Sequence, residues 1–144
     1  MPIEFENIIH DRVLISLDNI ISDEFNIPIF YSSQEGRGNS FFIITIENDS
    51  LLERGANFEA REYTLNIIYN LKIVGTNNTN TFKQISNIAE RCKKLISNNS
   101  SYSLENTYKW HDAQVNSIQY NENEDNEDLS TAIIEFNCVS TEVC

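Results

Sequence analysis

The sequence predicts an α+β fold, a two-layer sandwich in which two helices pack on one face of a mainly antiparallel sheet. Two segments repeat apolar residues every three or four positions, which is typical of amphipathic helices. The strand-like segments follow one another in runs and do not alternate with helices, which excludes a βαβ series. With 144 residues, the chain is expected to form a single domain, 1–144.

The first helix is predicted over Phe5 to Ser22. Its apolar residues recur at helical spacing and share one face: Phe5, Ile9, Val13, Leu17 and Ile20. Asn26 and Pro28 end the helix, because proline cannot continue it and restricts the residue before it.

Two strands follow the first helix. Ile29 to Ser33 is a short strand, and Gln34 to Asn39 is a polar loop. The glycines of this loop do not match a dinucleotide-binding motif, because a third glycine is missing and a strand follows. Ser40 to Glu47 is almost continuously apolar, which predicts a central strand covered on both faces.

The connection from Asn48 to Phe58 is longer than a usual hairpin loop and is a candidate contact site. It contains Leu51, Leu52, Glu53 and Arg54. A solvated loop gains nothing by exposing two leucines. We therefore expect either that they cap the core or that the loop contacts another subunit.

The longest strand is predicted over Glu59 to Ile73. From Tyr63 onward its odd positions are apolar or aromatic, and its even positions, apart from Ile68, are polar. Because successive side chains of a strand point to opposite faces, one face lies on a core and the other faces water.

The second helix is predicted over Thr81 to Ser97, after a polar linker from Gly75 to Asn80. Thr81 and Gln84 match a capping box. One apolar stripe faces the core: Ile85, Ile88, Ala89, Cys92, Leu95 and Ile96. Asn98 to Tyr108 is expected to be a polar connector without regular structure.

A hairpin closes the chain. Ala113 to Tyr120 is a strand with a bulge near Asn116 or Ser117, because its apolar residues Val115 and Ile118 are three apart. Leu129 to Val143 is the last strand. The tip between them carries five acids: Glu122, Glu124, Asp125, Glu127 and Asp128. Without a glycine and between strands, the tip does not match a calcium loop. It is a solvated hairpin end, a weak cation site, or a repulsive or docking surface.

The chemistry of the chain predicts no enzyme. The formal net charge of −12 disfavours binding to nucleic acid. No apolar run has the length of a membrane span. Cys92 could act as a nucleophile only with His10 or His111, but it lies on the apolar stripe of a helix. We expect no catalytic residue, no cofactor and no metal site. Trp110 either packs the connector onto the core or lies at an interface.

The order of these elements resembles that of the tail terminator (tail-completion, minor tail protein U-like) proteins of long-tailed bacteriophages. The similar parts are the two helices, the strands Ile29 to Ser33 and Phe41 to Glu47, the run from Arg61 to Ile67, and the hairpin Val115 to Thr141.

The resemblance implies a structural virion protein without catalysis or cofactor. Such proteins form a ring, usually a hexamer, that caps the tail tube, stops its elongation and offers a docking face to the head. Its partners would be its own copies, the tail-tube protein and a head-completion or neck protein. The loop with Leu51, Leu52, Glu53 and Arg54 would contact a neighbouring subunit or the tube, and the acidic tip would be a docking or lumen-facing surface. Genomic DNA would pass through without specific binding, and no membrane would be involved. The protein would be assembled in the host cytoplasm and reside in the tail or neck of the virion.

Two alternatives remain at this point. One is another head–tail connector, neck or tail-tube protein. The other is a monomeric acidic binding or regulatory module.

Overall fold

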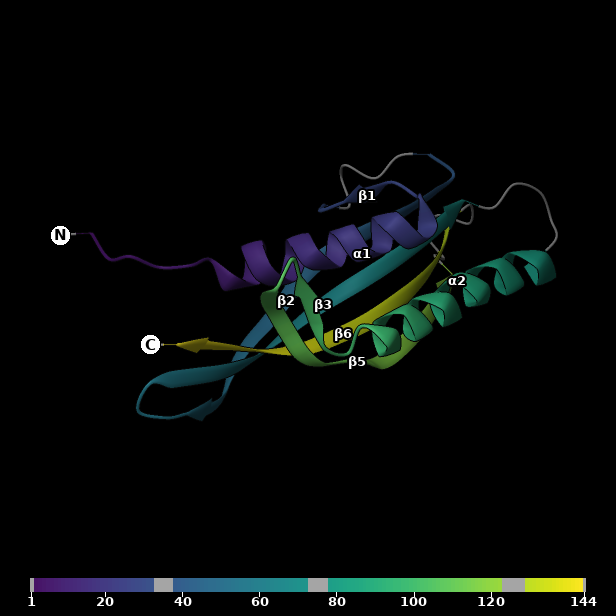
Figure 1. Ribbon diagram of the computed structural model, residues 1–144. Helices are drawn as coiled ribbons and strands as arrows, with labels where there is room; N and C mark the ends of the chain where they lie inside the picture. Colours follow the sequence, from purple (N-terminus) through teal and green to yellow (C-terminus); the bar gives the residue numbers. More distant parts are fainter. Residues whose placement is uncertain (1, 33–37, 73–77, 123–128, 144) are drawn as a thin grey trace.

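The computed structural model describes residues 2–32, 38–72, 78–122 and 129–143 (Figure 1). The elements follow one another as η1 (Ile8–Leu14), α1 (Ile15–Phe25), β1 (Ile29–Phe30), β2 (Ser40–Arg54), β3 (Phe58–Lys72), α2 (Asn78–Asn98), β4 (Tyr102–Leu104), β5 (Thr107–Glu122) and β6 (Leu129–Val143).

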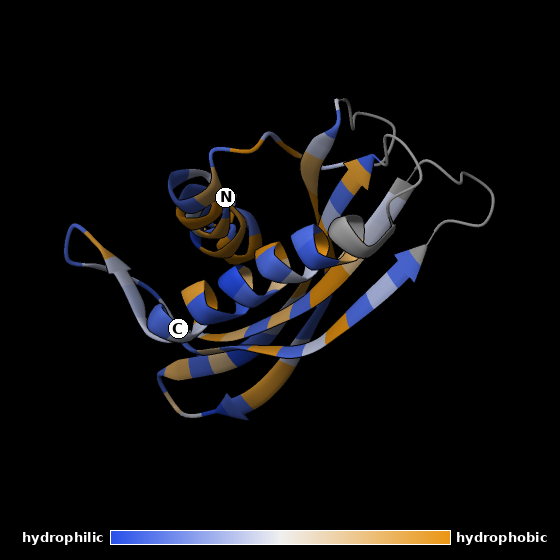
Figure 2. Ribbon diagram, turned by 90° about the vertical axis from the view of Figure 1, so that its right-hand side faces the viewer, coloured by the Kyte–Doolittle hydropathy of each residue, from blue (hydrophilic) through white to orange (hydrophobic). Residues whose placement is uncertain are grey.

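The six strands form one sheet in the order β1-β2-β3-β6-β5-β4. β1 runs parallel to β2, and the other neighbouring strands are antiparallel. Both helices share one apolar core with the sheet, and the sheet curls around them (Figure 2). The α+β class and the mainly antiparallel sheet are as predicted, but the curled sheet differs from a flat sandwich.

The central strand β3 has the predicted alternation. It pairs along its length with β2 on one side and with β6 on the other. Tyr63, Leu65, Ile67, Tyr69 and Leu71 are all buried against the helices. The bounds of β6 are also those predicted, and its core-facing side chains from Ala132 to Cys138 are fully buried.

The first helix begins at Ile8 and not at Phe5, which is 83% exposed. The Asn7 side chain accepts a hydrogen bond from the His10 amide at 3.3 Å and so caps the helix. The first seven residues form a wide π-helical turn, and α1 continues to Phe25. The helix therefore runs three residues beyond the predicted end at Ser22, and Asn26, one of the two residues predicted to stop it, follows with a left-handed backbone (φ 53°).

The predicted loop Asn48 to Phe58 is largely a strand. β2 continues to Arg54 and pairs with β3, so only residues 55–57 turn the chain. Two register shifts, at Ile46/Asn48 and at Leu51/Glu53, interrupt the alternation of side chains along β2. These bulges conceal the strand from a search for period-two patterning. In contrast, β1 is shorter than predicted and ends at Phe30.

The second helix begins at Asn78, three residues before the predicted start. Thr81 therefore lies in the first turn and is not the cap, so the predicted capping box is wrong. A first turn tolerates such polar residues because its amides lack partners within the helix. The apolar stripe is confirmed: Ile85, Ala89, Cys92 and Ile96 are buried, and Ile88 and Leu95 pack at its margin.

The predicted connector Asn98 to Tyr108 contains β4 and the start of β5. The two strands meet at Glu105 and Asn106, whose positive φ angles of 53° and 65° match a type I′ hairpin turn. β4 has only three residues, which is too short for an alternation of apolar and polar residues to predict it from the sequence. The bulge predicted near Asn116 or Ser117 is confirmed, because the register shifts between Val115 and Ser117.

Candidate functional site

Strands β2, β3 and β6 are longer than the helix formed by η1 and α1, which packs on the sheet. β2, β3 and β6 each have 15 residues, or about 50 Å at ~3.3 Å per residue. η1 and α1 together have 7 and 11 residues, or about 27 Å at ~1.5 Å per residue. One end of the sheet therefore extends beyond its cover. Figure 1 shows the β2–β3 hairpin projecting there, on the side of both chain termini.

This hairpin end, which comprises the hairpin Glu47–Glu59, the segment Pro2–Asn7 and Val143, exposes several large apolar side chains. Leu51 and Leu52 are 51% and 54% exposed. Ile3, Phe5 and Val143 are exposed to a greater extent. The prediction that the leucines cap the core is wrong, because the core ends before the hairpin does. Their role as a contact surface remains a prediction.

The hairpin is held in shape by its own polar groups. Arg61 donates to the Asp49 carboxylate at 2.6 Å and also to the Glu59 carboxylate, and so ties β3 to β2. The Gly55 amide donates to the Phe58 carbonyl at 2.9 Å across the turn. Glu53 and Arg54 are exposed at the tip and have no ion pair to any residue that the structure describes. The tip can therefore present a defined surface to a partner.

Arg12 fastens the N-terminal segment to the end of β6. Its guanidinium donates to both carboxylate oxygens of Glu6, at 2.7 and 3.0 Å. It also donates to the Ser140 hydroxyl and the Thr141 carbonyl, each at 2.9 Å. The hydrogen bond from Arg12 lowers the pKa of the Glu6 carboxyl. Phe5 is thus held at the rim of a shallow hollow of about 310 Å³ over Tyr63 and the Asp49–Arg61 pair.

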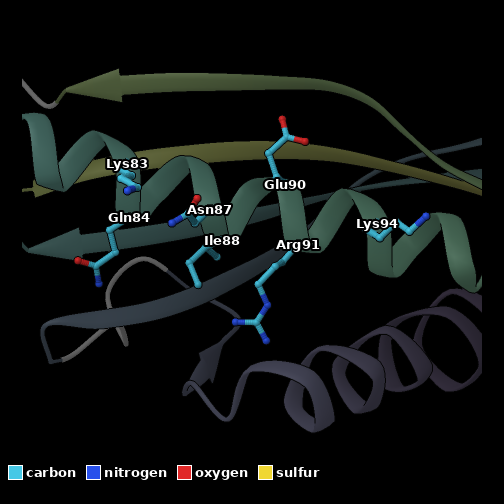
Figure 3. Close-up of a pocket in the computed structure, with 7 residues that line it drawn as sticks. All are labelled: Lys83, Gln84, Asn87, Ile88, Glu90, Arg91 and Lys94. Carbon is cyan, nitrogen blue, oxygen red and sulfur yellow. The ribbon is translucent and has the colours of Figure 1, made fainter.

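A second surface, the α2 groove, was not predicted from the sequence. It is a shallow groove of about 780 Å³ on the outer side of α2 (Figure 3). Ile88 provides apolar surface, and Lys83, Arg91 and Lys94 provide positive charge. Arg91 reaches the Glu24 carboxylate at 2.9 Å and lies over the Phe25 ring, 4.6 Å from its centroid. The groove is thereby connected to α1.

The candidate nucleophile Cys92 lies in an environment that opposes catalysis. It is fully buried on α2, and burial raises the pKa of its thiol to about 12. A thiolate is therefore strongly disfavoured at neutral pH. The His10 ring bonds to Asp11 at 2.7 Å, and the His111 ring bonds to the Tyr108 hydroxyl at 2.5 Å. In the described ranges, neither histidine has a hydrogen bond to Cys92.

Trp110 packs the chain onto the core, so the interface alternative is wrong. Its side chain is fully buried between Tyr102, which stacks on it at 5.1 Å, and Phe136, whose ring meets it edge-on at 5.5 Å. The indole N–H donates to the Asn99 carbonyl at 2.9 Å. This bond joins the end of α2 to β5.

Most of the predicted acidic tip lies outside the described residues. Glu124, Asp125, Glu127 and Asp128 are not described, and Glu122 is described only as the last backbone position of β5. Among the residues that the structure does describe, no group of three His, Cys, Asp or Glu side chains is arranged to hold a metal ion.

These features define an α+β domain whose candidate site is a contact surface on an overhanging sheet. No protein-family model matches the sequence, and a search of curated proteins finds no match. None of the described helices combines the length and apolar character needed to cross a membrane.

Proposed function

We propose that this protein is a structural virion protein of a long-tailed bacteriophage. It forms a ring that caps the tail tube, stops tube elongation and provides the face on which the head docks. The observation that carries the proposal is the projecting β2–β3 hairpin with its half-exposed Leu51 and Leu52. The order of elements, which resembles that of tail terminator proteins, supports it.

A subunit contact explains why the hairpin is apolar at its end. Burying a leucine side chain completely stabilises a contact by roughly 1.5–3 kcal/mol, and about half of each leucine is still exposed in the single chain. Two such leucines at each junction would contribute roughly 1.5–3 kcal/mol. A contact that joins two different surfaces of neighbouring copies closes into a ring when its rotation allows.

The charge of the chain fits a channel through which DNA passes without binding. Each copy has a formal net charge of −12, and acidic walls repel the phosphate backbone. Screening limits this repulsion to roughly 8 Å at physiological salt. Only carboxylates that line the lumen would therefore act on the DNA.

Electron microscopy and native mass spectrometry of the purified protein, alone and mixed with tail tubes, test the proposal. A hexamer of the 16.6 kDa chain has a mass of about 100 kDa, six times that of one copy. Rings that bind tube ends and prevent further growth would support the proposal. A protein that stays at 16.6 kDa at all concentrations and does not cap tubes would contradict it and favour the monomeric acidic module. Incorporation along the tube would instead favour a tail-tube protein.

A further inference from the structure

We propose that the α2 groove of one copy receives the tip of the β2–β3 hairpin from a neighbouring copy of the same chain. This inference rests on the proposed ring and specifies the contact that builds it. It identifies the two surfaces, the residues that join them and the direction of assembly.

The α2 groove is lined by three cations, Lys83, Arg91 and Lys94, and by one acid, Glu90, although the chain as a whole is acidic. Residues 82–98 contain four of the chain's ten Lys and Arg residues and one of its 22 acidic residues. Lys83 and Lys94 border the groove and form no ion pair to a described residue, whereas Arg91 is already paired with Glu24. Two free ammonium groups beside the apolar Ile88 suit a partner that combines carboxylates with apolar side chains.

The hairpin tip has this combination. Leu51 and Leu52 are exposed beside Glu53, and Glu47 lies further along the same strand. Asp49 and Glu59 are both paired with Arg61, so Glu47 and Glu53 are the hairpin acids that have no ion pair to a described residue. Arg54, the one cation of the hairpin Glu47–Glu59, would lie near Glu90 at the edge of the groove, where Glu90 already pairs with Lys93 at 2.8 Å.

The two surfaces lie at opposite ends of the sheet, as the strand register shows. The hairpin lies beside the end of β6, because Phe58 pairs with Val143. The start of α2 lies toward the other end, because Phe82 packs on Tyr120, which pairs with Ala132. One copy therefore cannot place its own hairpin in its own groove. Joining the two surfaces of successive copies gives a head-to-tail contact, which forms a ring when it closes.

An acidic protein surface fits the groove better than a nucleic acid does. A chain with a net charge of −12 repels phosphate backbones over most of its surface. The groove also offers the apolar side chain of Ile88, which gains nothing from a sugar-phosphate strand. Binding of nucleic acid to the groove is therefore an outcome that the experiment must detect, and it would count against the proposal.

Reciprocal charge reversal tests the contact. One variant combines Lys83→Glu with Lys94→Glu, a second combines Glu47→Lys with Glu53→Lys, and a third contains all four changes. Native mass spectrometry and sedimentation would measure the dissociation constant of the assembly. Each pair alone should weaken the contact at least about tenfold, because it places like charges opposite each other. The fourfold variant should recover most of the loss.

A control variant with the same change in net charge separates a specific loss of the contact from a general effect of added negative charge. Lys72→Glu combined with Gln114→Glu and Gln119→Glu changes the net charge by the same amount at exposed positions outside the groove and the hairpin, and should leave assembly unchanged. Circular dichroism of each variant would confirm folding, and Lys83→Gln with Lys94→Gln provides a milder test of the same groove. Rings that persist in both reversal pairs, no recovery in the fourfold variant, or loss of DNA binding in place of loss of assembly would overturn the hairpin–groove contact and leave the ring proposal standing. Absence of rings in the unaltered protein would overturn both.

Discussion

Replacing Arg12 with methionine should destabilise the protein by about 2 kcal/mol. The guanidinium is largely buried and donates to the Ser140 hydroxyl and the Thr141 carbonyl. A hydrogen bond from a charged donor contributes roughly 1.5–3 kcal/mol. Part of this is retained in the variant, because the Ser140 hydroxyl still donates to the Lys109 carbonyl at 2.8 Å. The ion pair with Glu6 adds only about 0.5 kcal/mol, since the Glu6 side chain is 45% exposed.

Urea and thermal unfolding of Arg12→Met and Glu6→Gln, compared with the unaltered protein, provide the measurement. A loss of about 2 kcal/mol lowers the Tm by roughly 6 °C in a domain of this size. Glu6→Gln is the matched control, because it removes the ion pair and keeps the bonds to β6. We expect it to cost less than about 1 kcal/mol. If Glu6→Gln destabilises the protein as much as Arg12→Met does, the assignment of the effect to the end of β6 is wrong.

The pH dependence of this comparison follows from Glu6. The hydrogen bond from Arg12 lowers the pKa of the Glu6 carboxyl below its ordinary value of 4.5. A lowered pKa in the folded state means that the stabilisation is complete above pH 4.5 and is lost as the pH falls through the folded value. The difference in unfolding free energy between the unaltered protein and Glu6→Gln should therefore shrink below this pH. A difference that grows on acidification would contradict the assigned direction.

Three further substitutions test the core and the hairpin. Trp110→Phe should cost about 2–3 kcal/mol in urea unfolding, because it leaves the Asn99 carbonyl without its 2.9 Å partner and creates a cavity; no change would contradict the anchoring role. Cys92→Ser should cost roughly 1–3 kcal/mol by burying a hydroxyl, and a thiol reagent should label Cys92 in the native protein only on unfolding, since burial raises its pKa to about 12. Rapid labelling of Cys92 in the native state would contradict its burial. Gly55→Ala should cost about 1 kcal/mol in thermal unfolding, because the added Cβ meets the Phe58 ring and forces it to move; unchanged stability would place the ring elsewhere.

The sequence predicts β3 and β6 well because both strands are paired on each side and bury one face along most of their length. Each pairs on both sides and presents one face to the helices, so an uninterrupted alternation from Tyr63 to Leu71, or from Ala132 to Cys138, is required. The second half of β2 faces no helix and contains two bulges, so neither burial nor register requires alternation there. Without this alternation, the sequence of the second half of β2 is typical of a loop, although the segment is a strand.

The start of the first helix shows a different limit. Phe5 lies at the correct spacing for the apolar face, but the Asn7 side chain caps the helix after it. The spacing of apolar residues shows which of them would share a face of a helix, but not where the helix begins. The capping hydrogen bond of Asn7 determines where it begins.

Of the two candidate surfaces, the sequence predicts only the one made of adjacent residues. Leu51 and Leu52 are neighbours in the chain and are conspicuous in a polar stretch. The α2 groove depends on a contact between Arg91 and Glu24, 67 residues apart, that only the folded chain creates. The concentration of four cations in residues 82–98 of an acidic chain is a detectable signal, but the helix dipole alone accounts for the three toward the C-terminal end, Arg91, Lys93 and Lys94.

The overhanging sheet gives these observations a common physical cause. A hairpin that no helix covers must order its residues at roughly 1–2 kcal/mol each, and a two-stranded ribbon is marginally stable in water. Here Arg61 and the backbone ladder hold the ribbon in place, yet the two leucines at its tip gain little from that order within one chain. A disordered loop would cost less and would expose the same side chains. The order of the hairpin and its apolar tip therefore support a partner that covers it, and the α2 groove of a neighbouring copy is the partner that we propose.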